Sequence, residues 1–242
     1  MVNQFPLIVD RRGSILNLTL NNPVKKNALN SEMMGALIAA IEESKNYEEL
    51  RVLVIRGEGS VFCSGADVNS WEPEKLQLLL KAIAECPIPT IADVHGVCLG
   101  GGMGLICACD FVISQKNTEF GFPEVRIGMI PAVILPYIFR KINLAKIREF
   151  FITGERFGND MAQSLGLLHH NNDLDTLLHS IKKGGPQAQK SIKFLLNEDI
   201  MSKPLNERDS ELATLISMIK EGQECKEGIS SFLAKRKPEW VE

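Results

Sequence analysis

Two glycine-rich turns, each placed after an apolar strand-like segment, constrain the fold of this chain more than any other feature. The apolar run 89–94 is followed by a glycine cluster within residues 100–104, which opens a further apolar segment. Upstream, the apolar run 51–55 is followed by Ser64-Gly65-Ala66-Asp67. A strand, a glycine turn and a helix N-terminus in this order direct backbone N–H groups at a negative charge, and glycine lets a ligand approach the main chain closely. Two such turns can place two N–H groups on one oxygen and form an oxyanion hole.

The glycine cluster by itself is also compatible with a purely structural role, a tight turn in which a helix packs closely on a strand. It does not complete either of the common phosphate-binding patterns. No acidic residue closes a second strand at the distance that a dinucleotide-binding fingerprint requires, and no Gly-Lys-Ser/Thr sequence ends the turn as in a P-loop. The residues alone therefore leave an oxyanion hole and a structural turn as two interpretations.

Composition and charge indicate a soluble globular protein. The chain has 242 residues, of which 45% are hydrophobic and 24% are charged, enough for one large core. A net charge of -3 with scattered basic residues gives no support for a nucleic-acid partner. The longest apolar runs contain prolines and are too short for a membrane span, and the N-terminus lacks the layout of a signal peptide. With six cysteines but no Cys-x-x-Cys pair, we expect reduced cysteines, no metal site, no membrane partner and a cytoplasmic location.

The order of hydrophobic patterns predicts an α/β fold followed by a helical C-terminal region. Strands are expected at residues 15–20, 51–55, 90–94 and 111–114. Helices are expected at 33–44, with Ser31 as N-cap, at 73–84, and, in an almost wholly helical last third, at 144–153, 173–183, 186–197, 205–220 and 226–236. No linker-like or low-complexity tract separates these parts. We therefore expect a core over residues 1–185 and a helical region over 186–242 that together form one functional unit.

Short motifs follow one another in a fixed order along essentially the whole chain. They are Asn27-Ala28-Leu29-Asn30, Phe62-Cys63-Ser64-Gly65-Ala66-Asp67, Gly96-Val97-Cys98-Leu99-Gly100-Gly101-Gly102, Cys109-Asp110, Phe120-Gly121-Phe122-Pro123-Glu124, Gly128-Met129-Ile130-Pro131, Gly166-Leu167 and, near the C-terminus, Glu227-Gly228 through Pro238. This series resembles the crotonase superfamily, the enoyl-CoA hydratase/isomerase fold. The resemblance implies an α/β, crotonase-like spiral of repeated β-β-α units and a helical C-terminal region that builds homotrimers or dimers of trimers. It also implies acyl-CoA thioester substrates and no metal or separate cofactor, because coenzyme A is part of the substrate.

The resemblance assigns the catalytic groups residue by residue. The N–H groups of Ala66 and Gly101 would form the oxyanion hole for the thioester carbonyl, which suits a reaction in which a proton leaves near that carbonyl and an enolate develops. Glu124 matches a catalytic carboxylate of the family. Its apolar neighbours Phe122 and Pro123 favour a raised pKa, in the range useful for proton transfer. Without the resemblance, an exposed glutamate in a turn is the simpler interpretation of Glu124.

The resemblance also implies contacts to coenzyme A and to the acyl chain. The expected substrate-binding residues are Lys25, Lys26, Ala28, Ser64, Asp67, Trp71, Gly100, Phe232 and Lys235. The two neighbouring lysines match the region for the adenine-ribose end, while Phe232 and Lys235 match C-terminal positions that in some relatives reach the coenzyme A of a neighbouring subunit. A helix N-cap is the alternative role for Asp67, and a solvated basic tail is the alternative for Lys235.

One position departs from the hydratase pattern of the family. Hydratases use two glutamates around the attacking water, and the first of them normally stands where this chain has Gly104. An enoyl-CoA hydratase-like enzyme with Glu124 as acid/base is the leading expectation, and Gly104→Glu should raise hydration if Gly104 is the limiting difference. A 3-enoyl-CoA to 2-enoyl-CoA isomerase, which needs Glu124 alone, and a non-catalytic acyl-CoA-binding homologue are the alternatives. Arg126 lies two residues beyond Glu124; on a strand it would share the face of Glu124, which makes it a candidate contact for a second substrate carboxylate.

Overall fold

The computed structural model describes residues 5–70, 72–169, 173–198, 202 and 204–241. The strands within them are β1 (Leu7–Arg12), β2 (Ile15–Leu20), β3 (Val52–Gly57), β4 (Thr90–Val94), β5 (Val97–Leu99), β6 (Phe111–Ser114), β7 (Glu119–Gly121) and β8 (Arg156–Phe157). The α-helices are α1 (Ser31–Ser44), α2 (Pro73–Ala84), α3 (Gly101–Ala108), α4 (Leu135–Lys141), α5 (Leu144–Thr153), α6 (Asn159–Ser164), α7 (Leu174–Lys183), α8 (Pro186–Asn197), α9 (Leu205–Glu221) and α10 (Gln223–Leu233). The 3-10 helices η1 (Pro23–Lys25) and η2 (Pro123–Ile127) lie within the described residues.

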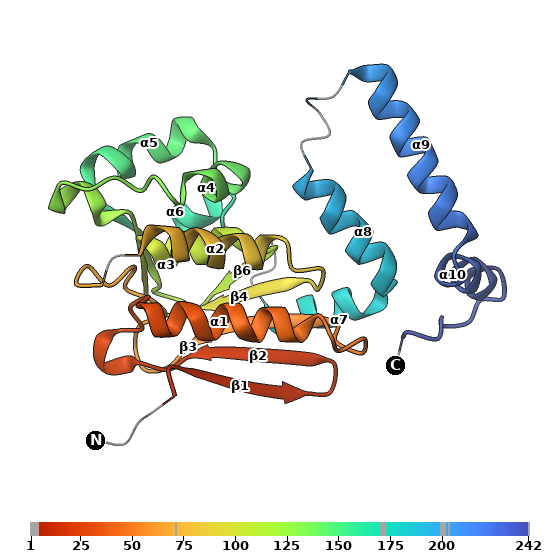
Figure 1. Cartoon of the computed structure of the whole chain (residues 1–242), viewed down its shortest axis with the longest axis horizontal. Helices are drawn as coiled ribbons and strands as arrows, with labels where there is room; N and C mark the ends of the chain where they lie inside the picture. Colours follow the sequence, from red (N-terminus) through yellow and green to blue (C-terminus); the bar gives the residue numbers. More distant parts are fainter. Residues whose placement is uncertain (1–4, 71, 170–172, 199–201, 203, 242) are drawn as a thin grey trace.

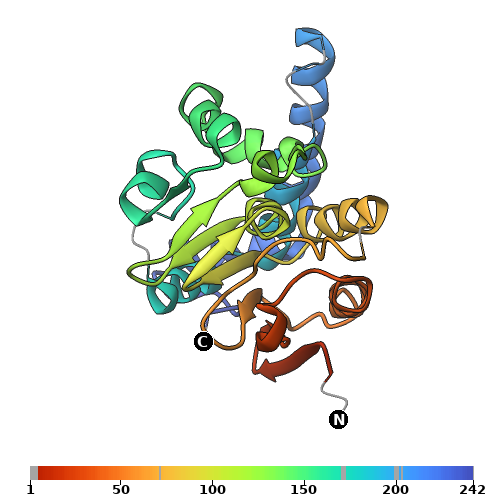
Figure 2. The same ribbon diagram turned by 90° about the vertical axis from the view of Figure 1, so that its left-hand side faces the viewer.

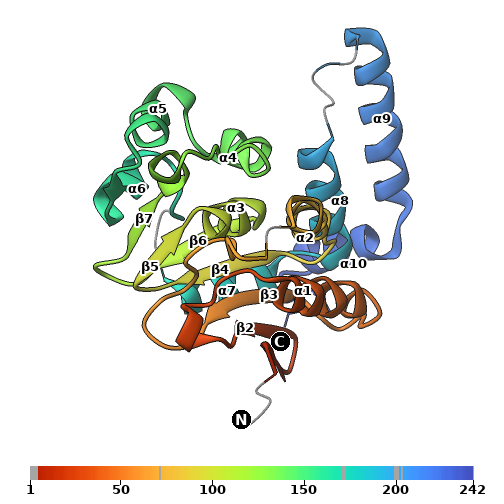
Figure 3. The same cartoon turned by 60° about the vertical axis from the view of Figure 1, so that its left-hand side comes forward.

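The larger sheet has five strands in the order β1-β2-β3-β4-β6. β1 and β2 form an antiparallel hairpin, and from β2 onward neighbouring strands run parallel. Residues 52–55 of β3 are buried on both faces of the sheet, which explains why they form a continuous apolar run, whereas most of β1 at the edge is exposed. Leu53 and Ile55 belong to the main core together with residues of α1, α2 and α3, whereas Val52 and Val54 belong to a second cluster with Leu177 of α7. Figures 1 and 3 show α1 and α2 lying side by side along this sheet.

A smaller sheet contains β5, β7 and β8, with β5 and β7 parallel and β7 and β8 antiparallel. Cys63 adds a parallel bridge to Cys98 at its edge, so that Cys63, Cys98, Phe120 and Phe157 form one row. Successive turns of the chain therefore pass through the larger sheet, then through the smaller one, and then into a helical segment. This repetition makes a spiral of β-β-α units and confirms the predicted fold class. Figure 3 shows β5 and β7 side by side next to α3.

Most of the predicted elements are confirmed, and several have the expected bounds. The helices at 73–84, 144–153 and 186–197 and the strands at 90–94 and 111–114 are present as predicted. The predicted N-cap of α1 is wrong. Asn30 caps the helix by accepting a hydrogen bond from the N–H of Met33 at 2.9 Å, and Ser31 is the first helical residue. The asparagine oxygen satisfies one of the free N–H groups of the first turn, which is the role expected of Ser31.

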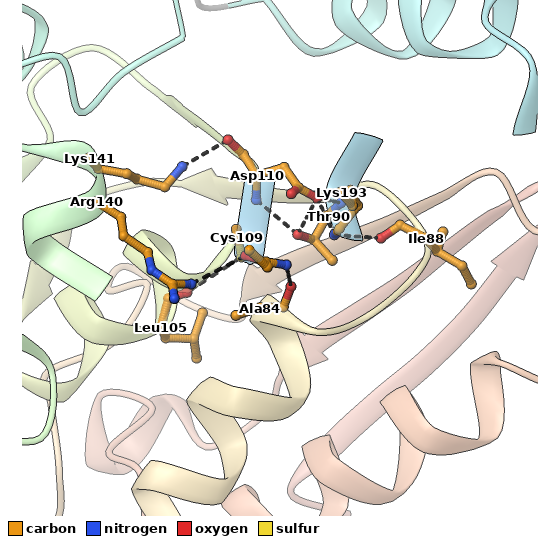
Figure 4. Close-up of polar contacts among 10 residues, drawn as sticks. Ala84, Ile88, Thr90, Leu105, Cys109, Asp110, Arg140, Lys141 and Lys193 are labelled. Carbon is orange, nitrogen blue, oxygen red and sulfur yellow. Dashed lines mark hydrogen bonds and ion pairs between the residues drawn. The ribbon is translucent and has the colours of Figure 1, made fainter. Parts of the chain in front are cut away.

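The C-terminal helices attach to the spiral through polar contacts of α8. The buried ammonium of Lys193 pairs with the carboxylate of Asp110 and donates to the carbonyl of Ile88 at 3.0 Å. The same carboxylate accepts hydrogen bonds from the N–H and the hydroxyl of Thr90 at 2.7 and 2.9 Å. Figure 4 shows this network, together with the hydrogen bond from Lys141 to the backbone carbonyl of Asp110. Asp110 therefore has a structural role, because its carboxylate joins α8 to β4.

Beyond α8 the chain leaves the spiral. Figure 1 shows α9 running next to α8, on the side of the molecule away from α4, α5 and α6, and in Figure 2 the blue N-terminal end of α9 projects beyond α4 and α5. Large apolar side chains are exposed on these last helices, namely Leu205, Ile216, Met218, Ile229, Phe232 and Leu233. The predicted trimerisation region and the domain boundary at residue 185 stay predictions, because the structure contains one chain.

The six cysteines behave as the sequence predicts. Five of them are buried, Cys225 is half-buried, and none forms a disulfide. Burial raises the pKa of the Cys63 and Cys107 thiols to about 12, so they pack as small apolar groups. Among the described residues, no helix combines the length and the apolarity needed to cross a membrane.

Candidate active site

The two glycine turns and Glu124 meet at one edge of the smaller sheet. Ala66 follows the bridge residue Cys63, Gly101 follows β5, and Glu124 follows β7, each within three positions. Because these segments are neighbouring and parallel, the residues that follow them lie together, at the strand end where ligands bind in open α/β sheets. They line a cavity of about 640 Å³ that is completed by α2 and the loop 127–134.

The backbone N–H of Ala66 takes no part in the hydrogen bonds of the β-bridge in which Ala66 lies. Leu29 forms a parallel bridge opposite Ala66, in which Leu29 donates to the carbonyl of Gly65 at 2.8 Å and accepts from the N–H of Asp67 at 3.1 Å. In this arrangement the flanking residues make the bonds, so the N–H of Ala66 itself points away from Leu29. A Cβ built on Gly101 would lie 3.1 Å from the nitrogen of Ala66. The N–H of Ala66 therefore lies directly beside the first residue of α3.

Gly101 supplies a second N–H at the same place. It is the first residue of α3, and the bonds of the helix begin with the N–H groups of Met103 and Gly104, which both donate to the carbonyl of Gly100. The first N–H groups of a helix have no acceptor within the helix and carry a partial positive charge. The structure thus brings the two N–H groups of the predicted oxyanion hole together at the wall of the cavity.

Close packing around the two turns requires glycine at two positions. Gly65 has φ +105° and Gly100 has φ +51°, a backbone region that side chains rarely allow. A Cβ on Gly65 would lie 3.1 Å from the carbonyl oxygen of Leu99, and one on Gly100 would lie 3.1 Å from Oε1 of Glu124. The carboxyl group of Glu124 therefore stands directly over the second turn.

Glu124 is half-buried within η2, directly after Pro123. Its Oε2 is buried and has no hydrogen-bond partner among the described residues. Burial is the largest influence on its pKa and raises it above the usual value for glutamate, because the charged form loses hydration. A carboxyl group with a raised pKa and a free oxygen, placed beside two N–H donors, has the chemistry needed to move a proton near a bound carbonyl.

The space next to Gly104 is filled by another side chain. A Cβ built on Gly104 would lie 2.3 Å from Cγ2 of Ile134 and 3.2 Å from Cδ1 of Leu80. Ile134 is 2% exposed and lines the cavity. The single substitution Gly104→Glu therefore does not fit this structure, which corrects the expectation that it would simply add a second carboxylate.

The predicted contacts for the adenine end lie near the mouth of the first turn. Lys25 and Lys26 are exposed, and the carbonyl of Lys26 accepts a hydrogen bond from the N–H of Ser64 at 3.0 Å. The ammonium of Lys25 lies 3.9 Å from the carboxylate of Asp67. Ala28 is half-buried on the same segment, and its N–H donates to the carbonyl of Lys25. The structure thus groups these residues around Ser64, which itself lines the cavity.

Other predicted residues stand apart from this group. Phe232 is 82% exposed on α10, and Lys235 is exposed just beyond it; neither lines the cavity of the single chain. Trp71 lies outside the described residues. The expected N-cap role of Asp67 is wrong, because α2 begins at Pro73 and the carboxylate of Asp67 accepts instead from the N–H of Asn69 at 3.0 Å, within a turn.

Glu124 and Arg126 do not share a strand face. Both residues lie in η2, where Arg126 turns out of the cavity to pair with the carboxylate of Glu155 and to donate to the carbonyl of Thr153 at 3.4 Å. A proline at the first position of η2 favours this helical turn over a continued strand. The histidine before the second turn has a structural contact, since Nε2 of His95 lies 2.9 Å from the carbonyl of Gly59.

Sequence reasoning missed the wall of the cavity. The loop 127–134 contributes most of the apolar lining, including Met129, Ile130, Val133 and Ile134. The motif Gly128-Met129-Ile130-Pro131 was a sequence landmark without a role. The signal that could have revealed this wall is the apolar run 127–134, which contains a proline and comes shortly after the candidate carboxylate.

Comparisons with known proteins agree with this geometry. Residues 10–242 match the family model described as enoyl-CoA hydratase/isomerase. The 2,3-dehydroadipyl-CoA hydratase of Escherichia coli (strain K12) is 29% identical over 97% of this chain and 98% of that protein. The enoyl-CoA isomerase/hydratase fer4 of Mycosarcoma maydis is 30% identical over 93% of this chain and 91% of that protein. Among solved structures, Pseudomonas aeruginosa AtuE superposes with a TM-score of 0.92 at 30% identity, covering 98% of this chain and all (100%) of that one.

Proposed function

Because the chain belongs to the enoyl-CoA hydratase/isomerase family, the crotonase superfamily, we propose that it acts on an enoyl-CoA thioester through an enolate, with Glu124 as the acid/base. The thioester carbonyl accepts hydrogen bonds from the N–H groups of Ala66 and Gly101. Negative charge develops on that oxygen when a proton leaves a neighbouring carbon or when water adds to the β-carbon, and it is lost when a carbon is protonated again. Two fixed donors, Ala66 in the first glycine turn and Gly101 at the N-terminus of α3, stabilise this charge.

The observation that carries this proposal is the position of one carboxyl group. Oε2 of Glu124 is buried without a hydrogen-bond partner among the described residues, and Oε1 stands over Gly100, next to the two N–H groups. Leaving a buried polar atom unpaired is costly unless a ligand pairs with it. A substrate held by its carbonyl at Ala66 and Gly101 presents its reacting carbons to this oxygen.

Hydration of a 2-enoyl-CoA is the leading candidate reaction, in line with the names of the relatives. Isomerisation of a 3-enoyl-CoA to a 2-enoyl-CoA is the second candidate. One specific observation favours it: Glu124 is the only acidic side chain among the described residues that line the cavity, and Ile134 fills the space next to Gly104. A shift of a proton between two carbons needs one group that can accept and return it, whereas hydration also needs a group to hold and activate the water.

Coenzyme A enters this proposal as part of the substrate. Lys25 and Lys26 lie near the mouth of the first turn and are placed to attract its phosphates. Phe232 and Lys235 do not reach the cavity of their own chain, so their proposed contact is with the coenzyme A of a neighbouring subunit in a homotrimer.

The test is mass spectrometry of 2-enoyl- and 3-enoyl-CoA substrates incubated with the protein in D₂O. Addition of water across the double bond identifies a hydratase. Migration of the double bond with deuterium incorporation and no added water identifies an isomerase. Unlabelled, unchanged substrates throughout, together with tight binding of coenzyme A esters, would overturn the enzymatic proposal and leave a binding protein.

A further inference from the structure

Ile134 and Gly104 form a reciprocal pair in the wall of the cavity. Ile134 is the N-cap residue of α4 and is 2% exposed, while Gly104 lies in the second turn of α3. A Cβ on Gly104 would lie 2.3 Å from Cγ2 and 2.9 Å from Cβ of Ile134. Only a residue without a side chain at position 104 leaves room for a branched side chain at position 134. The branched side chain therefore takes a space that adjoins the N-terminus of α3, where the substrate carbonyl is expected.

The surface around Ile134 is hydrocarbon. Leu76 of α2 and Met129, Ile130 and Val133 of the loop line the same cavity. Covering this wall with an apolar acyl chain is favourable, because it removes hydrocarbon surface from water on both sides. A charged group placed against it would lose hydration and receive no hydrogen bond in return.

Among the described residues, the cavity lining holds one acidic side chain and no basic one. Glu124 brings a carboxyl group to this lining, and a second carboxylate on the acyl chain would be repelled by its ionised form. Arg126, the basic residue nearest to Glu124 in the sequence, is held outside by Glu155 and by the carbonyl of Thr153. Both observations disfavour an acyl chain that ends in an acid.

On the basis of the proposed function, we propose that Ile134 is a specificity-determining residue, which closes the wall beside Gly104 and restricts the site to uncharged hydrocarbon acyl chains. The E. coli relative is named for 2,3-dehydroadipyl-CoA, whose chain ends in a second carboxylate. The protein described here is proposed to have a different specificity, because hydrocarbon side chains line its cavity and no basic residue among those described is there to pair with a second carboxylate.

The substrate class is tested by calorimetric titration of the wild-type protein with hexanoyl-CoA and with adipyl-CoA, which have six-carbon chains and differ in the terminal carboxylate. Hexanoyl-CoA is expected to bind at least tenfold more tightly, the factor that corresponds to about 1.4 kcal/mol. Equal affinities, or tighter binding of adipyl-CoA, would overturn the inference. These saturated esters report on the pocket without any turnover.

The role of Ile134 is tested by Ile134→Ala and by the milder Ile134→Val. The valine variant serves as the test if the alanine variant does not fold. Both open space beside Gly104, so the ratio of the dissociation constants for hexanoyl-CoA and 4-methylpentanoyl-CoA should shift toward the branched ester, more for alanine than for valine. Ile152→Ala, at an exposed position on α5, is the control and should leave the ratio unchanged. An unchanged ratio in folded Ile134→Val and Ile134→Ala would contradict the role of this residue.

Turnover of hex-2-enoyl-CoA and hex-3-enoyl-CoA in D₂O separates this inference from the proposed function. Selective binding of hexanoyl-CoA without any turnover supports the ligand class and overturns the enzymatic proposal. Turnover with equal affinity for the two saturated esters supports the enzyme and overturns the specificity assigned to Ile134.

Discussion

The cavity has two sides that are built in different ways. One side consists of backbone: the N–H groups of Ala66 and Gly101, held by the bridge to Leu29 and by the start of α3. The other side consists of side chains from the loop 127–134, with Ile134 packed against Gly104. In the proposed function, the first side polarises any thioester carbonyl, because peptide groups do not depend on residue type. In the same proposal, the second side decides which acyl chain, and which reaction, the site accepts.

The largest expected effect comes from Glu124, which stands between the two sides. Glu124→Gln keeps the size of the side chain but removes its ability to exchange a proton, and should lower kcat by about 10³-fold, within the usual range for an acid/base residue. The dissociation constant of a saturated acyl-CoA should change little, since the N–H donors remain. Steady-state kinetics and calorimetry on the same sample measure both quantities. Full activity of this variant would refute the assignment of Glu124.

The backbone side is tested by Gly65→Ala. The added Cβ would lie 3.1 Å from the carbonyl oxygen of Leu99 at a backbone φ of +105°, so the turn must shift and carry the N–H of Ala66 with it. Loss of one oxyanion donor typically costs about 10²-fold in kcat, and we expect a loss of that order.

Gly13→Ala is the matched control for the backbone strain of that variant. Gly13 also has a positive φ, of +59°, but a Cβ there meets nothing within 4 Å. It belongs to the β1–β2 turn and does not line the cavity. This variant should lose stability by about 1 kcal/mol and keep its kcat. Equal kinetic effects of the two substitutions would show that strain, and not the position of Ala66, explains the loss.

The side-chain wall is tested by a double-mutant cycle on Gly104 and Ile134. Gly104→Glu alone should lower the free energy of unfolding by about 1–3 kcal/mol, because it overpacks the core. Adding Ile134→Gly removes the obstructing side chain, so the pair should be coupled by at least about 1 kcal/mol. The double variant should also gain water addition to a 2-enoyl-CoA relative to either single variant. Denaturant unfolding and the D₂O assay measure these changes, and additive unfolding energies would contradict the contact.

The division between a backbone side and a side-chain side of the cavity also explains which features could be predicted from the sequence. The glycine turns, the strands before them and the C-terminal helices follow from local patterns, and most of these predictions are confirmed. The predictions fail where a contact between distant or competing residues determines the local structure or the direction of a side chain. Asn30 takes the cap expected of Ser31, and Arg126 lies outside the cavity because Glu155 and a backbone carbonyl hold it. The contact of Ile134 with Gly104 joins residues 30 positions apart, and no periodic pattern marks such a pair.

The smallest expected effect is a pH dependence that Glu124 gives to stability. Its pKa is raised in the folded protein, so the folded chain keeps this proton at pH values at which the unfolded chain has released it. The stabilising contribution is therefore present below the ordinary glutamate pKa of about 4.3 and is lost as the pH rises through the raised value. The glutamine of Glu124→Gln cannot ionise, so the variant keeps its stability as the pH rises through this range. The Tm of this variant minus that of the wild type should thus be larger at pH 7 than at pH 4, by thermal denaturation in matched buffers. An equal difference at both pH values would mean that the carboxylate is hydrated in the folded state, and it would contradict a pKa of Glu124 that is raised by folding.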